Sequence, residues 1–158
     1  MIRWQWSRYE DLSKNDLYEL LAVRQQVFAV EQQINCVDPD GLDKKAWHLL
    51  GWWAEAGNDR RLAAYLRVLY PGCKFSEPAI GRVLTIAEIR GTGVGHQMMA
   101  EAIKRIDKEV PGSEIRMSAQ CHLEKFYLQH GFEISSEPYL EEGIEHVEMT
   151  RQPLDYTV

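Results

Sequence analysis

Apolar positions follow different periods along this chain, and the changes of period predict where helices and strands lie. Ser13-Lys-Asn-Asp16 resembles a capping box, in which a side-chain acceptor precedes an acidic residue by three positions. The apolar residues that follow at helical spacing are Leu17, Leu20, Leu21 and Phe28. We therefore predict a helix over residues 15–29, preceded by a first strand over residues 2–6.

The middle of the chain predicts a hairpin followed by alternating strands and helices. His48–Ala54 and Leu62–Leu69 have the composition of strands, and the turn-forming Gly57-Asn-Asp-Arg60 lies between them. The later predicted elements are a strand over 80–86, a helix over 95–110, a strand over 115–119, a helix over 122–130, and strands over 132–134 and 146–150. This order predicts a mixed sheet covered by helices on its faces.

Length and composition indicate one globular domain over residues 1–158. Hydrophobic residues make up 45% of the chain and charged residues 27%. The net charge of −6 argues against a nucleic-acid partner and fits attraction of a cationic small molecule. No apolar run approaches the roughly 20 residues that span a bilayer, and no signal peptide is recognised. The three cysteines lack C-x-x-C spacing, so we expect free thiols in a cytoplasmic protein.

A glycine-rich turn, Arg90-Gly-Thr-Gly-Val-Gly95, joins a predicted strand to a predicted helix. The free N–H groups at such a turn, with a helix dipole worth roughly half a positive charge, favour an anion such as a pyrophosphate. The turn lacks the lysine of a Walker loop and the G-x-G-x-x-G spacing of a Rossmann loop. It matches the acyl-CoA pyrophosphate loop, [Q/R]-x-x-G-x-[G/A].

With Phe126-Tyr127-Leu-Gln-His-Gly131-Phe132 downstream, the chain resembles the GNAT superfamily of N-acetyltransferases over nearly its whole length. Within the superfamily it resembles the ElaA-like branch. The sequence segments that show this resemblance are Val30-Glu31-Gln32, Asp38-x-Asp40-x-x-Asp43, His48, Ile80-Gly-Arg-Val83, Ala119-Gln-x-His122-Leu123 and Glu141-x-Gly143-Ile144-x-His146. The resemblance implies an α/β (α+β) fold, with a mixed, mostly antiparallel sheet of about six to seven strands and helices on both faces.

The resemblance also implies roles for particular residues. It implies that the backbone of Val83, Leu84 and Thr85 binds the pantetheine arm of acetyl-CoA. It implies that the loop binds the pyrophosphate through Arg90, Gly91, Thr92, Gly93, Val94, Gly95 and His96. Tyr127 stands where the family has the acid that protonates the departing thiolate, and the alternative for Tyr127 is a core residue. Many members have an Asn near the start of the short helix, where this chain has Cys121 and His122.

Acetyl transfer needs a neutral amine, so a base or a water chain must remove a proton. Glu31 is the first candidate, because it follows the first helix, where the family's acceptor site lies. His48 is the second, because a neutral imidazole is available near pH 7. The alternatives are a solvated charge for Glu31 and a hydrogen-bonded strand residue for His48. A backbone N–H near Leu84 or Thr85 is expected to stabilise the oxyanion.

The remaining charged and aromatic residues suggest no metal site. Asp38, Asp40 and Asp43 do not complete an EF-hand pattern, and we expect a solvated turn. A second possibility is that these carboxylates attract a cationic acceptor. Arg82 is expected to pair with an acidic residue across the sheet, and contact with the acceptor is the alternative. The tryptophans at 47, 52 and 53 are expected to pack in the core.

These features predict an N-acetyltransferase that moves the acetyl group of acetyl-CoA to an amine by direct attack. Acetyl-CoA is the only expected cofactor, and no metal is expected. The expected partner is a small-molecule or peptide amine, and neither a nucleic acid nor a membrane is expected. Two other functions keep the same loop: a non-catalytic acyl-CoA-binding or sensing module, and a nucleotide-binding regulator.

Overall fold

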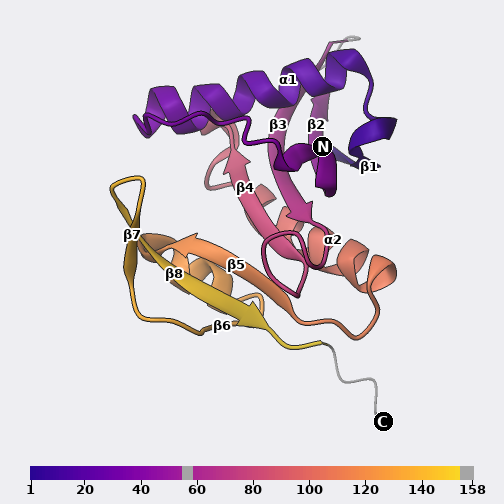
Figure 1. Cartoon of the computed structure of the whole chain (residues 1–158). Helices are drawn as coiled ribbons and strands as arrows, with labels where there is room; N and C mark the ends of the chain where they lie inside the picture. Colours follow the sequence, from indigo (N-terminus) through magenta and orange to yellow (C-terminus); the bar gives the residue numbers. More distant parts are fainter. Residues whose placement is uncertain (55–58, 154–158) are drawn as a thin grey trace.

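The computed structural model describes residues 1–54 and 59–153, and these residues build one sheet with helices on both faces (Figure 1). The strands are β1 (Ile2–Arg8), β2 (Ala46–Ala54), β3 (Arg60–Leu69), β4 (Ala79–Thr85), β5 (Ile115–Gln120), β6 (Phe132–Ile134), β7 (Tyr139–Glu141) and β8 (Ile144–Arg151). The helices are α1 (Lys14–Arg24), α2 (Val94–Glu109) and α3 (Glu124–Leu128). A π-helical segment, Gln25–Glu31, continues α1.

Neighbouring strands of the sheet run antiparallel, except where β4 meets β5. The order is β1-β2-β3-β4-β5-β8-β6, and β7 pairs with β8. Within the described residues, β4 and β5 pair only at Ala79 with Arg116 and at Ile80 with Met117. Beyond Ile80 the register between β3 and β4 also shifts, and Arg82 there has a φ of +53°. This β-bulge accompanies the divergence of β4 from β5 that Figure 1 shows.

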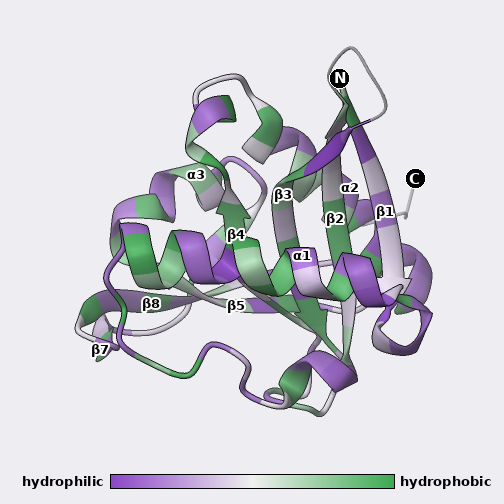
Figure 2. Cartoon of the chain, turned by 90° about the horizontal axis from the view of Figure 1, so that it is seen from above, coloured by the Kyte–Doolittle hydropathy of each residue, from purple (hydrophilic) through white to green (hydrophobic). Residues whose placement is uncertain are grey.

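Two apolar layers hold the helices on the sheet. On one face, Leu20 and Val27 pack against Leu50, Tyr65 and Leu84 of the central strands. On the other face, the apolar stripe of α2 packs on β2, β3 and β5 through Val94, Met98, Met99, Ala102, Ile103 and Ile106. Hydrophobic colour accordingly follows the central strands in Figure 2, whereas the helices carry both colours. The predicted mixed, mostly antiparallel sheet with helices on both faces is confirmed.

The first helix agrees with the prediction at its start and differs in its winding near its end. The backbone N–H of Asp16 donates to the Ser13 hydroxyl over 3.0 Å, which confirms the Ser13 cap, whereas the Asp16 carboxylate accepts from Gln5 and Arg60 and does not complete the box. The helical winding extends to Glu31, two residues beyond the predicted end. Its last part is π-helical, because the N–H of Gln32 donates to the carbonyl of Val27, five residues earlier. Periodicity alone does not reveal such a change.

The other elements lie close to their predicted positions, with one strand missed. Strand β7 has only three residues and follows Pro138, so it carried no alternating pattern. The predicted hairpin of β2 with β3 is confirmed by antiparallel pairing, although residues 57 and 58 of its turn lie outside the described residues. Trp47 and Trp52 are buried and Trp53 packs against the core, as expected. No described helix is both long and apolar enough to cross a membrane.

Candidate functional site

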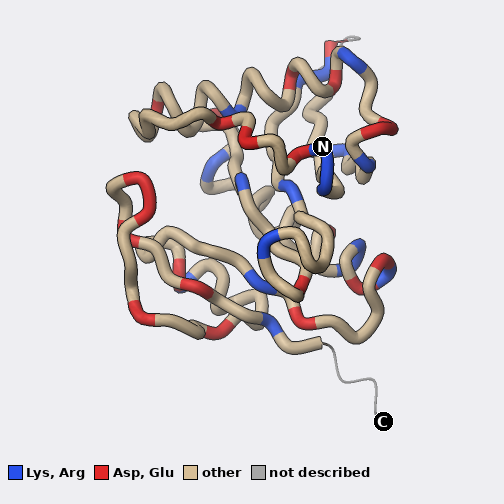
Figure 3. Tube along the Cα trace, viewed as in Figure 1, with Lys and Arg blue, Asp and Glu red and all other residues tan. Residues whose placement is uncertain are grey.

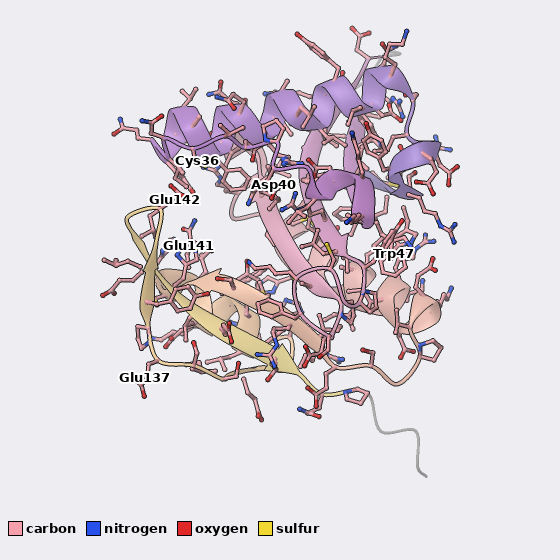
Figure 4. The ribbon with its side chains drawn as sticks, viewed as in Figure 1. Cys36, Asp40, Trp47, Glu137, Glu141 and Glu142 are labelled. Atoms are coloured by element: carbon pink, nitrogen blue, oxygen red, sulfur yellow. The ribbon has the colours of Figure 1, made fainter. Side chains whose placement is uncertain are left out.

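A cleft of about 520 Å³ opens where β4 and β5 diverge. Its walls are residues 80–83 of β4 and residues 117–120 of β5. The segment from Gln32 to Leu42 forms one rim, and the hairpin of β7 and β8 forms the opposite rim. In Figure 4, Cys36 and Asp40 belong to the first rim, whereas Glu141 and Glu142 belong to the hairpin. The fold therefore forms a cleft between these two strands.

The glycine loop presents unpaired donors at the start of α2. Gly91 and Gly93 have φ of +81° and +89°, a backbone region that favours glycine. Within the described residues, the backbone N–H groups of Gly91 and Gly93–His96 have no hydrogen-bond acceptor. The N–H of Thr92 differs, because it donates to the carbonyl of Ile89 over 3.3 Å. Five donors thus gather where the helix dipole favours an anion.

The backbone of β4 is open on the side that faces the cleft. Val83 lines the cleft, and Leu84 is buried and pairs with Tyr65 of β3. Thr85 is also paired with β3, at Ala64. Its carbonyl accepts hydrogen bonds from Nε and Nη2 of Arg90, over 3.1 and 2.8 Å. The part of β4 with the fewest backbone partners is therefore the stretch around Val83.

Arg90 and Glu31, predicted for different roles, form an ion pair. Arg90 Nη2 lies 2.7 Å from Glu31 Oε2, and both side chains are partly exposed. Together with the bonds from Arg90 to Thr85, this pair links the end of the first helix to the end of β4. Glu31 is not among the described residues that line the cleft, whereas Gln32 and Phe28 on the same helix are.

Tyr127 lies at the cleft with its ring in the core. The residue is 3% exposed and packs edge-on against Phe126 and Phe132. Its hydroxyl has no hydrogen-bond partner within the described part of the chain, and Tyr127 lines the cleft. Burial raises the pKa of this phenol above its ordinary value. The phenol therefore stays protonated at neutral pH, with its hydroxyl available as a donor.

The expectation of a solvated turn at Asp38, Asp40 and Asp43 is wrong, because Asp38 and Asp43 are buried and arginines pair with all three carboxylates, although Asp40 stays partly exposed. Arg24 is fully buried, and its Nε and Nη1 lie 2.9 Å from Asp38 and 2.7 Å from Asp43. Arg67 is also buried and binds both Asp40 and Asp43. Burial alone would raise the pKa of Asp43, but hydrogen bonds and charge from Arg24 and Arg67 outweigh it and lower that pKa.

Arg82 completes this cluster from β4. Its Nε lies 2.9 Å from Asp38, and its Nη2 lies 3.4 Å from Asp40. The expectation that Arg82 pairs with acidic residues is thus confirmed, although its partners lie on the rim segment. We call the six residues Arg24, Asp38, Asp40, Asp43, Arg67 and Arg82 the arginine–aspartate cluster. Blue and red segments accordingly meet near the upper rim in Figure 3. With three charges of each sign, the cluster has no excess negative charge to attract a cation.

His48 lies under this cluster and away from solvent. It is 0% exposed, its Nδ1 lies 2.7 Å from the Tyr65 hydroxyl, and its Nε2 lies 2.9 Å from the Asp43 carbonyl. Burial lowers the pKa of this imidazole. Both ring nitrogens therefore have protein partners, and neither is placed to meet an acceptor amine. The arrangement corresponds to the alternative of a hydrogen-bonded strand residue.

Arg24 and Arg67 were not singled out in the sequence, although a signal was present. Arg24 lies four residues after Leu20 and three before Val27, within the apolar stripe of the first helix. Arg67 lies inside the apolar run of β3. An arginine at an apolar position requires a buried acidic partner, and the rim segment supplies three.

The described residues offer no metal centre, and a second hollow in the fold lacks the candidate residues. The described residues contain no group of three or more His, Cys, Asp or Glu side chains that could hold a metal. A hollow of about 590 Å³ lies between α2 and the residues around Gly131. It contains none of the residues predicted to bind or react, so the cleft between β4 and β5 is the candidate site.

Comparison with known proteins identifies the class of this fold and site. The acetyltransferase (GNAT) domain family matches residues 56–153. A UPF0039 protein of Synechocystis is 44% identical over 148 residues, which cover 94% of each chain. Protein ElaA of Escherichia coli is 38% identical over 156 residues, which cover 96% of this chain and 97% of ElaA. The chain belongs to the GNAT acetyltransferase family, in the branch that contains ElaA.

Solved structures agree with this assignment. An acyl-CoA N-acyltransferase from Pseudomonas aeruginosa has a TM-score of 0.88 and 36% identity, and the match covers 96% of this chain and 99% of that one. Escherichia coli ElaA has a TM-score of 0.87 and 37% identity, with 96% of this chain and all of that one covered. The family and these neighbours support acyl transfer as the chemistry, with an acyl-CoA as co-substrate.

Proposed function

We propose that this protein transfers the acetyl group of acetyl-CoA to the nitrogen of an amine by direct attack. The observation that carries the proposal is the set of five unpaired N–H groups on the glycine loop, at the start of α2. In this proposal the loop binds the pyrophosphate through Gly91, Thr92, Gly93, Val94, Gly95 and His96. Arg90 holds the loop against β4 through Thr85.

The reactive end of the co-substrate then enters the cleft where β4 leaves β5. The pantetheine arm pairs with the backbone around Val83, Leu84 and Thr85, where β4 has lost its neighbour β5. A free backbone N–H of this stretch stabilises the negative charge that develops on the thioester oxygen. Tyr127 gives its proton to the departing thiolate, because its hydroxyl has no other partner and burial keeps it protonated.

The acceptor is a small-molecule or peptide amine that enters between the rim segment and the hairpin. Both rims expose polar groups to a cleft of about 520 Å³, which leaves room beside the thioester. Nucleic acid and membrane are not proposed as partners, given the net charge of −6. The protein is expected to act in the cytoplasm, in keeping with its free cysteines.

An acceptor screen that follows the release of free CoA tests this function. The panel contains a peptide amino terminus, lysine, a polyamine, an amino sugar and hydroxylamine, each with acetyl-CoA. Calorimetric titrations with acetyl-CoA, ATP and NAD test the co-substrate separately. Tight binding of ATP or NAD without binding of acetyl-CoA would favour a nucleotide-binding regulator. Binding of acetyl-CoA without CoA release from any amine would favour a sensing module.

The variant Tyr127→Phe tests whether Tyr127 is the general acid. We expect kcat to fall by about 100-fold or more, because general-acid catalysis contributes on this scale, while the Kd for acetyl-CoA stays unchanged. The matched control is Tyr18→Phe, which changes an exposed tyrosine on α1, outside the cleft. Equal turnover of the Tyr127 variant and the wild type would remove Tyr127 from the mechanism.

A further inference from the structure

We propose that His146 on β8 is the general base that takes a proton from the acceptor amine, with Glu141 on β7 stabilising the imidazolium that results. This inference rests on the proposed amine acylation. It differs from the sequence-based candidates, because Glu31 pairs with Arg90 outside the cleft lining and His48 is buried under the arginine–aspartate cluster. Among the described cleft-lining residues, His146 is the only histidine.

One hydrogen bond fixes the protonation of the His146 ring. Nδ1 lies 2.8 Å from the backbone carbonyl of Ile144, and a carbonyl oxygen only accepts hydrogen bonds. Nδ1 therefore carries the hydrogen, and in the neutral ring Nε2 holds the lone pair. Within the described residues, Nε2 takes part in no hydrogen bond, and its charged neighbour is the Glu141 carboxylate 3.4 Å away, so its lone pair is available to a proton. The tautomer needed by a base is thus set by the backbone of its own strand.

The side chain of His146 is nearly buried and lines the cleft. The Tyr139 ring stacks on the imidazole, with ring centroids 6.2 Å apart. On the adjacent strand, His146 pairs in register with Gln120 at the end of β5. The side chain is 10% exposed, and the residue lines the same cleft as Tyr127. The base and the acid therefore reach one cavity from different elements.

Glu141 is the charged group nearest the imidazole. Its Oε2 lies 3.4 Å from His146 Nε2, a distance at which a protonated ring forms an ion pair. The same carboxylate lies 3.4 Å from the Ser118 hydroxyl, which in turn bonds the Tyr139 hydroxyl. These contacts hold Glu141 beside the ring. The hairpin thus supplies the imidazole, its counter-charge and the ring that packs on it.

The carboxylates of the cleft are less suited to this role. Asp38 and Asp40 are bound by arginines, and arginine-bound carboxylates are poor bases. Glu142 is exposed, at the turn between β7 and β8. In Figure 4, Glu141 and Glu142 face the rim that carries Cys36 and Asp40. The mouth of the cleft lies between these two rims. His146 lies inside this mouth, where an entering ammonium group would meet it.

The proton balance of the reaction fits these two residues. His146 takes one proton from the acceptor ammonium and passes it to solvent through the cleft mouth. The neutral nitrogen attacks the thioester carbon, forming the C–N bond as the C–S bond breaks. The thiolate takes the Tyr127 proton, and the second proton leaving the nitrogen returns to the phenolate. One amide, one CoA thiol and one released proton result, without any further reactant.

The variant His146→Asn tests this role while keeping a side-chain N–H for the Ile144 carbonyl. We expect kcat to fall about 100-fold or more with the fastest amine of the panel, and acetyl-CoA affinity to stay unchanged. The charged or titratable groups that face the ring, Glu141 and Tyr139, stay in place in this variant. Glu141→Gln should lower kcat less than His146→Asn does.

Hydroxylamine as the acceptor distinguishes a general base at position 146 from a residue with a purely structural role. This acceptor is largely unprotonated at neutral pH, so the defect of His146→Asn should shrink at least about tenfold compared with an alkyl amine. A purely structural defect would be equal for both acceptors, and that result would overturn the role. Turnover of His146→Asn equal to that of the control His122→Asn, an exposed histidine, would overturn it too. Absence of CoA release by the wild type with every amine would instead overturn the proposed function and this inference together.

Discussion

Two irregular segments of this fold differ in whether their polar groups have partners within the protein. In the loop of residues 90–96, five backbone donors have no partner within the described chain. In the segment of residues 38–43, three carboxylates are bound by Arg24, Arg67 and Arg82. The carboxylates of the cluster have partners within the protein, although Nε of Arg67 has none among the described residues, whereas the aligned donors of the loop are available to a ligand. We therefore propose the loop as the binding element, whereas the cluster supports the rim of the cleft.

Removal of Arg24 should have the largest effect on the stability of the fold. Arg24→Met leaves Asp38 and Asp43 buried with one positive partner fewer, so we expect a loss of about 3–5 kcal/mol in the free energy of unfolding. Urea unfolding measures it. The control is Arg61→Met, which removes an exposed pair with Glu88 and should leave the urea midpoint unchanged. Equal midpoints for the two variants would show that the cluster does not support the fold.

Acidification should lower the free energy of unfolding in two stages, the first from His48 and the second from the aspartates of the cluster. The pKa of His48 is lowered in the folded state, so the unfolded chain binds more protons below about pH 6.5 and stability begins to fall there. The pKa values of Asp43 and Asp40 are also lowered, so their contribution is complete above about pH 4 and is lost below it. Urea midpoints between pH 8 and pH 3 measure both stages.

A variant tests whether His48 causes the first of these two declines in stability. His48→Asn should remove the decline that begins near pH 6.5 and keep the decline below about pH 4. A wild-type midpoint that stays constant from pH 8 to pH 5 would contradict the contribution of His48. A midpoint unaffected down to pH 3 would contradict that of the aspartates.

A change in the glycine loop should alter binding more than stability. Gly93→Ala places a side chain at a φ of +89°, and no atom lies within 4 Å of the added Cβ, so its cost is conformational, about 1 kcal/mol. Because the change also tilts the neighbouring N–H groups, we expect acetyl-CoA affinity to fall about tenfold. Calorimetry measures this. Gly112→Ala is the matched control, because it also has a positive φ, +75°, and no atom within 4 Å of the added Cβ, but it lies beyond the far end of α2. It should bind acetyl-CoA as the wild type does, and equal affinities for the two variants would argue against the loop.

Much of the fold could be predicted from sequence, because its helices and strands depend on local patterns. The apolar stripe of α2 and the Ser13 cap identify helices through contacts within a few residues. Strand β7 and the π-helical end of the first helix were missed, since neither has a pattern of its own. Two parts of the candidate site, the loop and Tyr127, were recognised through their sequence motifs. Both carry hydrogen-bond donors that have no acceptor among the described residues.

The family, the order of the elements and the residues of the glycine loop can be identified from sequence, because each depends on residues close together along the chain. The role of the acidic segment depends on the tertiary fold. Arg24 and Arg67 reach this segment from a helix and a strand and convert an apparently solvated turn into a paired and largely buried cluster. Likewise, His146 meets Glu141 and the cleft only when β7 folds back on β8 beside β5. The charge state and reach of these side chains depend on neighbours that are distant in sequence.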